Sequence, residues 1–189
     1  MIGENISFQT FYTSKEESNC PLITEFVRID RNIEKKGFSK DIDSLTSSMR
    51  YGKRVIINSD YEKIGEISRR DILEIVDYDP VKKTLLVIGP KKPKVDSSVH
   101  WMIHHARSEI NAVVQLNGQK ILEKFEGKIP STENEQTPGS FEMIKEVLKI
   151  LRDSKSVFVK NYGIIFVGNG VNDVEGNILN VYKKIGEKQ

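Results

Sequence analysis

The sequence predicts an α/β fold in which strands in the middle of the chain lie between amphipathic helices. Short runs rich in valine, isoleucine and leucine, bounded by glycine, proline or asparagine, follow one another over residues 45–88. Apolar residues recur at helical spacing before this region, over 22–33, and after it, over 141–151 and 171–185. The chain has 189 residues, enough for a sizeable core, and we expect residues 1–189 to form one domain.

Composition and charge exclude several classes of protein. The formal net charge of +2 is too small to indicate binding to nucleic acid or to a membrane surface, so we expect neither partner. Cys20 is the single cysteine, which excludes a disulfide framework and a Cys-x-x-Cys metal or redox site. The first residues lack the pattern of a signal peptide, and no apolar run approaches the ~20 residues of a membrane span. We expect a soluble, cytoplasmic protein.

The first predicted element is a helix that follows a loosely packed lead-in over residues 1–17. Asn19 and Pro21 are typical of a helix start, and Gly37 is typical of a helix end. One face of this helix carries apolar residues at helical spacing and is expected to be buried: Leu22, Ile23, Phe26, Ile29 and Ile33.

Strands dominate the region that follows. Residues 45–51 and 53–58 are predicted to form two strands on either side of Gly52. Residues 68–71 have the pattern of a capping box, which predicts a short helical turn. The runs I-L-E-I-V-D-Y and T-L-L-V-I, separated by an Asp-Pro turn, then predict a pair of strands.

The second half of the chain alternates helices with strands. A helix is predicted over 96–107, a short apolar strand over 112–116 and a further helix within 118–129. The remaining predicted elements are an amphipathic helix after Ser140, strands over 156–160 and 164–167, and a closing helix over 171–185.

Polar residues gather at the start of the helix over 96–107. Asp96, His100 and His104 share one face at i, i+4, i+8 spacing, and these residue types are ordinary zinc ligands. Because one straight helix rarely closes a tetrahedral site alone, we expect no metal there. Asp96 has a second interpretation, as a carboxylate that caps the helix.

Three lysines, Lys91, Lys92 and Lys94, precede the same helix. Two interpretations remain open. The run is a solvated basic loop, as most charge runs are, or Lys94 contacts an anion at the helix N-terminus, where unpaired N–H groups attract negative charge.

The region around this helix resembles the class II aldolase/adducin family. Members usually carry K-P-S-S-E before the helix and A-V-V-H-x-H in the strand after it. Here the matching residues are Pro93-Lys94-Val95-Asp96 and Ala112-Val113-Val114-Gln115-Leu116-Asn117. A second match has Asn161-Tyr162-Gly163 where the family usually has N-H-G. The resemblance spans about residues 19–185 and implies a central, mainly antiparallel β-sheet flanked by helices.

The resemblance fails at the residues that carry the family's chemistry. Family zinc is held by three histidines and polarises an oxygen of the substrate, while an acidic residue moves a proton. Gln115, Asn117 and Tyr162 stand at the histidine positions. Amide oxygens are poor zinc ligands, and a tyrosine would have to lose its proton against an ordinary pKa of about 10. We expect no catalytic zinc and no other cofactor.

The family's substrate-anion segments are also altered. In the first, G-N-x-S-x-R, this chain keeps only Ser48 and Arg50. In the second, T-P-S-G, it has Ile57-Asn58-Ser59-Asp60, and a carboxylate at the glycine position would repel an anionic substrate. The resemblance leaves Asp96 and Tyr162 as candidate catalytic residues and five candidate ligand-binding residues: Ser48, Ser59, Lys94, Gln115 and Asn117.

Two functions follow from this pattern. The favoured hypothesis is a zinc-free, non-catalytic protein that binds a polar or anionic small molecule or serves as an oligomeric scaffold, because a fold does not carry function without its site residues. The alternative is a sugar-phosphate aldolase, a carbon–carbon lyase, or a related carbonyl enzyme with a site rebuilt from Asp96, Tyr162 and Lys94. The resemblance implies a cyclic homotetramer. Four aromatic residues are candidates for its contacts: Phe8, Phe11, Tyr12 and Trp101.

Overall fold

The computed structural model of the chain describes residues 8–186, and its strands and α-helices follow the predicted order with one addition. The strands are β1 (Gln9–Ser14), β2 (Ser44–Tyr51), β3 (Arg54–Asn58), β4 (Ile72–Asp79), β5 (Thr84–Ile88), β6 (Ala112–Asn117), β7 (Ser156–Val159) and β8 (Gly163–Gly168). The helices are α1 (Ile23–Lys35), α2 (Ser97–Ala106), α3 (Gln119–Phe125), α4 (Phe141–Ile150) and α5 (Val171–Gly186), with short 3-10 turns η1 (Phe38–Lys40) and η2 (Arg69–Asp71).

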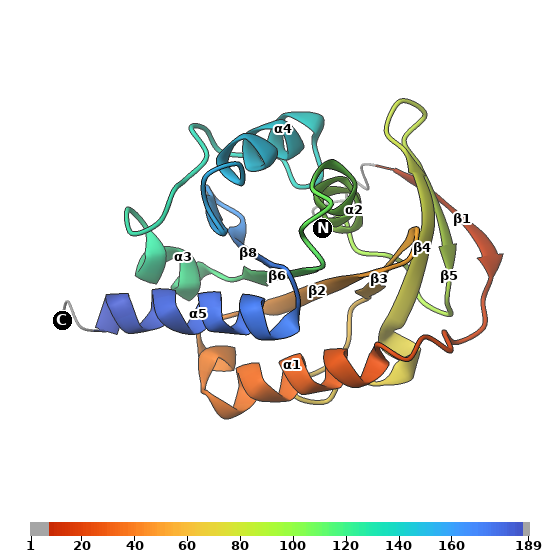
Figure 1. The fold of residues 1–189 in the computed structure, drawn as a ribbon, viewed down its shortest axis with the longest axis horizontal. Coiled ribbons are helices and arrows are strands. Elements are labelled where there is room, and N and C mark those ends of the chain that lie inside the picture. Colours follow the sequence, from red (N-terminus) through yellow and green to blue (C-terminus); the bar gives the residue numbers. More distant parts are fainter. Residues whose placement is uncertain (1–7, 187–189) are drawn as a thin grey trace.

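The strands form one eight-stranded sheet with helices on both faces (Figure 1). Their order is β1-β5-β4-β3-β2-β6-β8-β7. Among the described pairings, β1 lies parallel to β5 and every other neighbouring pair is antiparallel. The predicted fold class, a central and mainly antiparallel sheet flanked by helices, is confirmed.

The added element is β1, which falls within the expected lead-in over residues 1–17. Gln9–Ser14 forms an edge strand against β5, and Phe8 before it is buried. Loose packing therefore does not describe residues 9–14, while residues 1–7 lie outside the described part of the chain. The segment Q-T-F-Y-T-S gives little strand signal of its own, because its pairing partner lies more than seventy residues later in the sequence.

Three of the predicted turn and cap residues act where the sequence placed them, whereas the helix start predicted at Asn19 is wrong, because the N-cap of α1 is Leu22. Gly37, with φ 76°, follows α1, and Gly52, with φ 59°, turns the chain between β2 and β3. Both lie in the left-handed region that glycine enters without steric cost. The Ser140 hydroxyl accepts a hydrogen bond of 3.1 Å from the Met143 N–H and so caps α4. These local signals explain why the predicted element boundaries hold to within a few residues.

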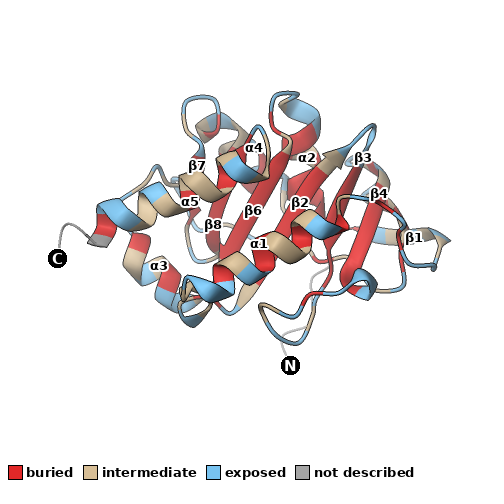
Figure 2. Cartoon of the chain, turned by 60° about the horizontal axis from the view of Figure 1, so that its bottom comes forward, coloured by how far each residue is buried: buried red, intermediate tan, exposed pale blue. Residues whose placement is uncertain are grey.

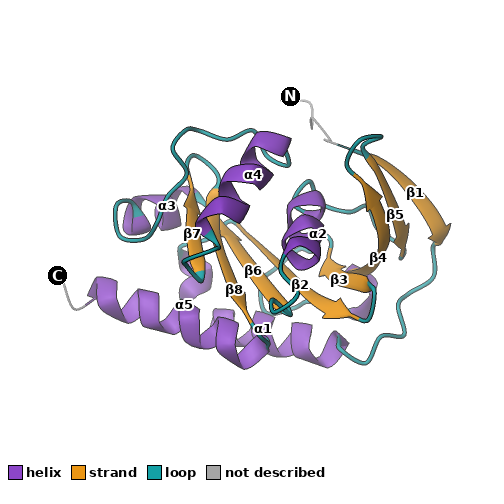
Figure 3. Ribbon diagram, turned by 45° about the horizontal axis from the view of Figure 1, so that its top comes forward, coloured by secondary structure: helices purple, strands orange, loops and turns teal. Residues whose placement is uncertain are grey.

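The helices divide between the two faces of the sheet. Apolar side chains of α1, α3 and α5 pack on one face, including Phe26, Phe125 and Ile178. Figure 2 shows α1 and α5 lying across this face, with the strands buried behind them. Helices α2 and α4 cover the opposite face (Figure 3). No helix among residues 8–186 is both long and apolar enough to cross a membrane.

The face under α2 and α4 has two separate apolar clusters. One joins α4 to β6, β7 and β8, and the other joins Trp101 of α2 to β3, β4 and β5. Strand β2 lies between these two groups of strands. On the other face of β2, Leu45 and Met49 belong to the cluster under α1. Because neighbouring residues of a strand alternate between faces, Thr46, Ser48 and Arg50 form a polar seam under α2.

Candidate binding site

Polar side chains of β2 meet polar side chains of α2 along this seam. The strand supplies Thr46, Ser48 and Arg50, and the helix supplies Asp96, His100 and His104. Two residues of a strand advance about 6.6 Å and four residues of a helix advance about 6 Å. A strand with polar residues at every second position therefore stays in step with a helix that has polar residues at every fourth.

Asp96 lies at the amino-terminal end of the seam and is almost fully buried, with 2% of its surface exposed. The Thr46 hydroxyl donates to one carboxylate oxygen at 3.0 Å, and the Tyr162 hydroxyl donates to the other. The carboxylate makes no cap hydrogen bond to α2. The interpretation of Asp96 as a helix cap is therefore wrong, and the two predicted catalytic residues are in direct contact.

Burial shapes the protonation of this pair. It raises the pKa of Asp96, while the hydrogen bond from Tyr162 and the charge of Lys94 act in the opposite direction. Burial, followed by the charge of Asp96 and the hydrogen bond to it, raises the pKa of Tyr162 far above its ordinary value. The phenol consequently keeps its proton and serves as a donor to the carboxylate.

Gln115 and Asn117 of β6 lie beside this pair. The Gln115 amide donates to the side-chain oxygen of Asn117 at 2.9 Å, and its own oxygen lies 3.3 Å from Nε2 of His100. Gly163, directly after Tyr162, lets β8 approach closely, since a Cβ there would collide with the Asn117 amide oxygen. The structure thus brings four of the predicted site residues together: Asp96, Gln115, Asn117 and Tyr162.

Ser48 occupies the middle of the seam, away from solvent. Its hydroxyl lies 2.7 Å from Nδ1 of His100 and 2.9 Å from Nε2 of His104. Both rings are fully buried, and burial lowers the pKa of each histidine to about 3. Asp96 does not converge with the two rings on a common point, because it meets Thr46 and Tyr162, whereas both rings meet Ser48.

Arg50 closes the carboxyl-terminal end of the seam. Its Nη2 donates to the carbonyls of Arg107 at 3.1 Å and Ile110 at 3.0 Å, and also to that of His104. Its Nε donates to the Asn111 side chain at 3.1 Å. The last carbonyls of a helix lack partners within the helix. Arg50 donates to them, so its guanidinium positions α2.

Lys94 connects the buried seam to a pocket of about 520 Å³. Only 7% of its side chain is exposed, and its ammonium donates to the Leu45 carbonyl at 3.0 Å and the Thr46 hydroxyl at 3.3 Å. A carboxylate oxygen of Asp60 lies 3.3 Å away on the pocket side. Of the two interpretations of the lysine run, a solvated loop therefore does not describe Lys94.

Carboxylates outnumber ammonium groups around this pocket. Its charged lining residues are Glu34, Asp43, Asp60, Glu62, Lys63 and Lys94. The four acids exceed the two lysines, so the local potential is negative. Such a potential disfavours anionic ligands and tolerates polar neutral or cationic ones.

Ser59 does not line this pocket, although it neighbours Asp60. Its hydroxyl donates to the Asp71 carbonyl at 3.0 Å, and its backbone N–H donates to the same carbonyl at 2.7 Å. Only 1% of Ser59 is exposed. The structure therefore separates Ser59 from the other predicted ligand-binding residues and gives it the task of fixing the chain before Asp60.

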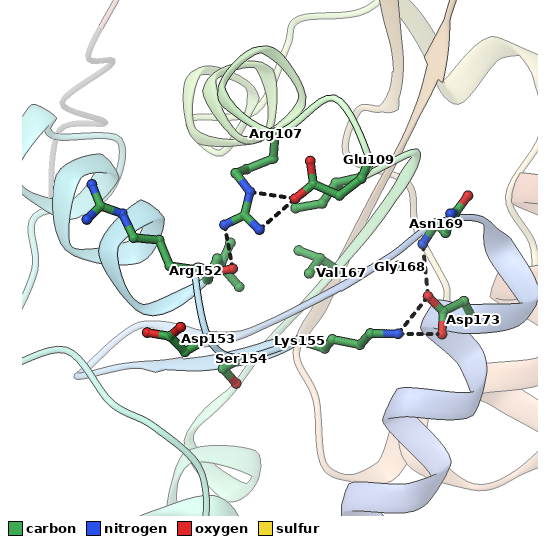
Figure 4. A pocket seen from close by; sticks show the side chains of 12 residues that line it. Arg107, Glu109, Arg152, Asp153, Ser154, Lys155, Val167, Gly168, Asn169 and Asp173 are labelled. Atoms are coloured by element: carbon green, nitrogen blue, oxygen red, sulfur yellow. Dashed lines mark hydrogen bonds and ion pairs between the residues drawn. The ribbon is translucent and has the colours of Figure 1, made fainter.

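A second pocket, of about 370 Å³, lies at the other end of α2 and is drawn in Figure 4. Four of its six charged side chains form ion pairs with one another. Arg107 bonds Glu109 at 2.6 Å and the Leu151 carbonyl at 2.6 Å, and Lys155 bonds Asp173 at 3.0 Å. It contains none of the predicted site residues, so the pocket beside Lys94 is the candidate site.

The chain matches known proteins by structure but not by sequence. No family model and no curated protein sequence matches the chain. Solved structures do match. An L-fuculose 1-phosphate aldolase is 14% identical with a TM-score of 0.68, and the match covers 91% of this chain and 88% of that one. The N-terminal class II aldolase domain of a conserved protein from Thermoplasma acidophilum is 15% identical with a TM-score of 0.64, covering 92% and 96%. The chain has the class II aldolase fold.

A further match shows how varied the proteins of this fold are. YgbL from Escherichia coli, described as a putative aldolase/epimerase/decarboxylase, is 13% identical with a TM-score of 0.68, covering 87% of this chain and 86% of that one. At such identities the likeness concerns the fold alone. The chemistry of this chain therefore depends on its own residues and not on its fold.

The residues at the histidine positions of the class II aldolase fold do not fit a zinc ion. Gln115 and Asn117 bond each other, and the Tyr162 hydroxyl donates a hydrogen bond to Asp96. Within residues 8–186, no group of three or more His, Cys, Asp or Glu is placed to hold a metal. Two neutral amides and a protonated phenol lack the charge and softness that zinc ligands supply.

The sequence interpretation missed two parts of the site. Thr46, which bonds both Asp96 and Lys94, was not a candidate, although the alternation T-x-S-x-R in a strand marks one polar face. The contact of Asp60 with Lys94 was also missed, because the two residues lie on loops that only the fold brings together. The alternation was readable from the sequence, whereas the loop contact was not.

Proposed function

We propose that this chain is a zinc-free protein of the class II aldolase fold that binds a polar small molecule in the pocket beside Lys94 and does not catalyse aldol cleavage. One observation carries the proposal. The polar groups that stand at the catalytic positions of the fold are satisfied by one another, and both oxygens of Asp96 already accept hydrogen bonds within the protein.

Proton transfer requires a base that reaches the substrate within hydrogen-bond distance. Asp96 is 2% exposed, and Tyr162 covers one of its oxygens. Tyr162 itself holds its proton, because burial and the neighbouring carboxylate raise its pKa. Neither residue is therefore poised to remove a proton from a sugar phosphate.

The pocket supports a binding function without catalysis. Its volume of about 520 Å³ falls in the range of about 300–1,000 Å³ typical of small-molecule sites. Its lining is mostly polar and carries excess negative charge. These features fit a polar ligand with hydroxyl or amine groups better than they fit a phosphorylated sugar.

We also propose that the protein serves as an oligomeric scaffold, and this part of the proposal rests on fewer residues. Two of the aromatic residues expected at a homotetramer contact, Phe8 and Trp101, belong to the core. Tyr12 is half-buried, and its hydroxyl bonds the Lys91 carbonyl at 3.1 Å. Phe11 is 47% exposed on the edge strand β1, so it is the member of the set best placed for a contact between subunits.

The alternative, a sugar-phosphate lyase, draws support from the names of several structural neighbours, which include L-fuculose 1-phosphate aldolases and a sugar-phosphate aldolase. It also draws support from the contact of Asp96 with Tyr162 and the nearby Lys94 ammonium. In a rebuilt site, Asp96 would have to lose the hydrogen bond from Tyr162 and accept a proton from the substrate. The charge of the pocket opposes phosphate entry, and for this reason we place binding first.

Three measurements on untagged protein separate these functions. Metal analysis and an assay of L-fuculose 1-phosphate cleavage should give no stoichiometric zinc and no turnover above denatured protein. A thermal-shift screen of polar metabolites should give at least one stabilising neutral or cationic compound. Zinc at one equivalent together with cleavage would overturn the proposal, and so would a screen in which no compound raises the melting temperature.

A further inference from the structure

We infer that Asp60 is a specificity-determining residue of the pocket, a carboxylate built into the chain that occupies the anion-binding position of Lys94 and excludes oxyanion ligands. The inference rests on the proposed function only for the location of the pocket. It adds the chemical class of the ligand, which is neutral or cationic, and names the residue that imposes this choice.

The geometry of the Lys94 ammonium is the first step. An ammonium has three hydrogens to donate. Two of them are taken by the scaffold, at the Leu45 carbonyl and the Thr46 hydroxyl. The third group within reach is the Asp60 carboxylate, at 3.3 Å. Asp60 is therefore the one partner of Lys94 that a ligand would have to replace.

The two members of the ion pair differ sharply in exposure. The Asp60 side chain is 86% exposed, whereas that of Lys94 is 7% exposed. A buried ammonium without a counter-charge is costly. The buried Asp96 carboxylate, which shares the Thr46 hydroxyl with Lys94, supplies one counter-charge, and Asp60 adds a second on the solvent side of Lys94. Because Asp60 reaches it from the solvent side, the carboxylate stands where an incoming phosphate or carboxylate would bind.

The backbone around Asp60 is held in place from two sides. Lys91 donates to the Asp60 carbonyl at 2.9 Å and to the Asp71 carboxylate at 2.5 Å. Ser59 is tied to the Asp71 carbonyl through both its hydroxyl and its N–H. The side chain of Asp60 thus projects from a fixed point, although the carboxylate itself is in solvent. Its position next to Lys94 is a property of the fold.

Charge repulsion makes this arrangement selective. An oxyanion approaching Lys94 meets the Asp60 charge at contact distance and the charges of the other lining acids further away. Coulomb energy falls with distance and is screened by salt, so the nearest carboxylate dominates the exclusion. Ligands with hydroxyl or ammonium groups avoid this penalty and gain acceptors from the same carboxylates.

The test is a titration of 15N-labelled full-length protein with inorganic phosphate, followed by amide chemical shifts at constant ionic strength. The variant is Asp60→Asn, and the matched control is Glu62→Gln, which removes an exposed acid that lines the same pocket without contacting Lys94. We expect Asp60→Asn to bind phosphate at least about tenfold more tightly than wild type, and Glu62→Gln to change affinity by less than about twofold.

The shift changes locate the bound phosphate without a second variant. In Asp60→Asn protein they should centre on Leu45 and Thr46, whose oxygens hold the Lys94 ammonium. No gain in affinity for Asp60→Asn, an equal gain for Glu62→Gln, or shifts centred elsewhere would overturn the inference. A wild-type metabolite screen without hits would refute the proposed function and leave this result standing, so the two failures are distinguishable.

Discussion

The two ends of α2 contact the same strand but differ in what they leave available. At the carboxyl-terminal end, Ser48 and His104 are buried, and Arg50 donates to carbonyls at the end of the helix. At the amino-terminal end, Asp96 is equally buried, but its neighbour Lys94 reaches a pocket and an exposed carboxylate. The seam therefore has two roles. The carboxyl-terminal end fixes the helix, and the amino-terminal end presents the charge of Lys94 to ligands.

The largest expected effect is the loss of Arg50. Replacement by alanine leaves carbonyls at the end of α2 without their donors, and hydrogen bonds from a charged donor are worth about 1.5–3 kcal/mol each. We expect Arg50→Ala to lower the free energy of unfolding by about 3 kcal/mol or more. Urea unfolding followed by circular dichroism measures this change in the free energy of unfolding.

The matched control for Arg50 is Arg70→Ala. Arg70 is 81% exposed and pairs with Glu17 at the surface. Exposed ion pairs are worth about 0–1 kcal/mol, so this variant should unfold close to wild type. Equal losses for the two arginines would contradict the role of Arg50 as the anchor of α2.

The second effect is a loss of stability in mild acid. His100 and His104 stay neutral in the folded protein down to a pKa of about 3, whereas unfolded histidines take up protons below about 6.5. The unfolded chain therefore gains protons first, and stability falls as pH drops through this window. Each histidine contributes up to about 1.4 kcal/mol per pH unit, and the raised pKa of Asp96 offsets at most one of them.

We therefore expect the free energy of unfolding to fall by about 1 kcal/mol or more per pH unit between pH 6 and pH 5. Urea unfolding across this range provides the slope. A flat profile over the same range would show that the buried rings are protonated in the folded state.

The third effect concerns the amino-terminal end. Tyr162→Phe removes a donor to the buried Asp96 carboxylate, at an expected cost of about 1–2 kcal/mol at pH 7. Because the hydroxyl holds the pKa of Asp96 down, its removal raises that pKa further. A raised carboxylate pKa favours folding at low pH and loses that contribution as pH rises. The cost should therefore shrink at pH 4.

Tyr51→Phe is the control for this prediction. Tyr51 is 41% exposed at the end of β2, and its hydroxyl makes no side-chain hydrogen bond among the described residues. The unfolding free energy of Tyr51→Phe should match that of wild type at pH 7 and at pH 4. If Tyr162→Phe shows the same cost at pH 4 as at pH 7, the phenol does not act through the charge of Asp96.

How far the sequence predicted this molecule depends on how local each signal is. Gly37, Ser140 and the apolar period of α1 specified helix limits, because caps and periods act within a few residues. The strand β1 was missed, because its pairing with β5 is non-local. Sequence resemblance brought Asp96, Tyr162 and Gln115 into one hypothesis, and the structure places them in contact. It also grouped Ser59 with them, whereas Ser59 bonds Asp71 instead.

The smallest expected change in stability accompanies the largest expected change in ligand preference. Asp60→Asn removes an ion pair whose carboxylate is 86% exposed, so its net contribution to folding is about 0–1 kcal/mol. The Leu45 carbonyl and the Thr46 hydroxyl still hold Lys94, and the asparagine oxygen can accept from it. We expect the unfolding free energy to change by less than about 1 kcal/mol, measured beside Arg50→Ala in the same buffer. A loss as large as that of Arg50→Ala would mean that Asp60 belongs to the part of the seam that fixes the fold, and that ligand preference at Lys94 cannot vary without it.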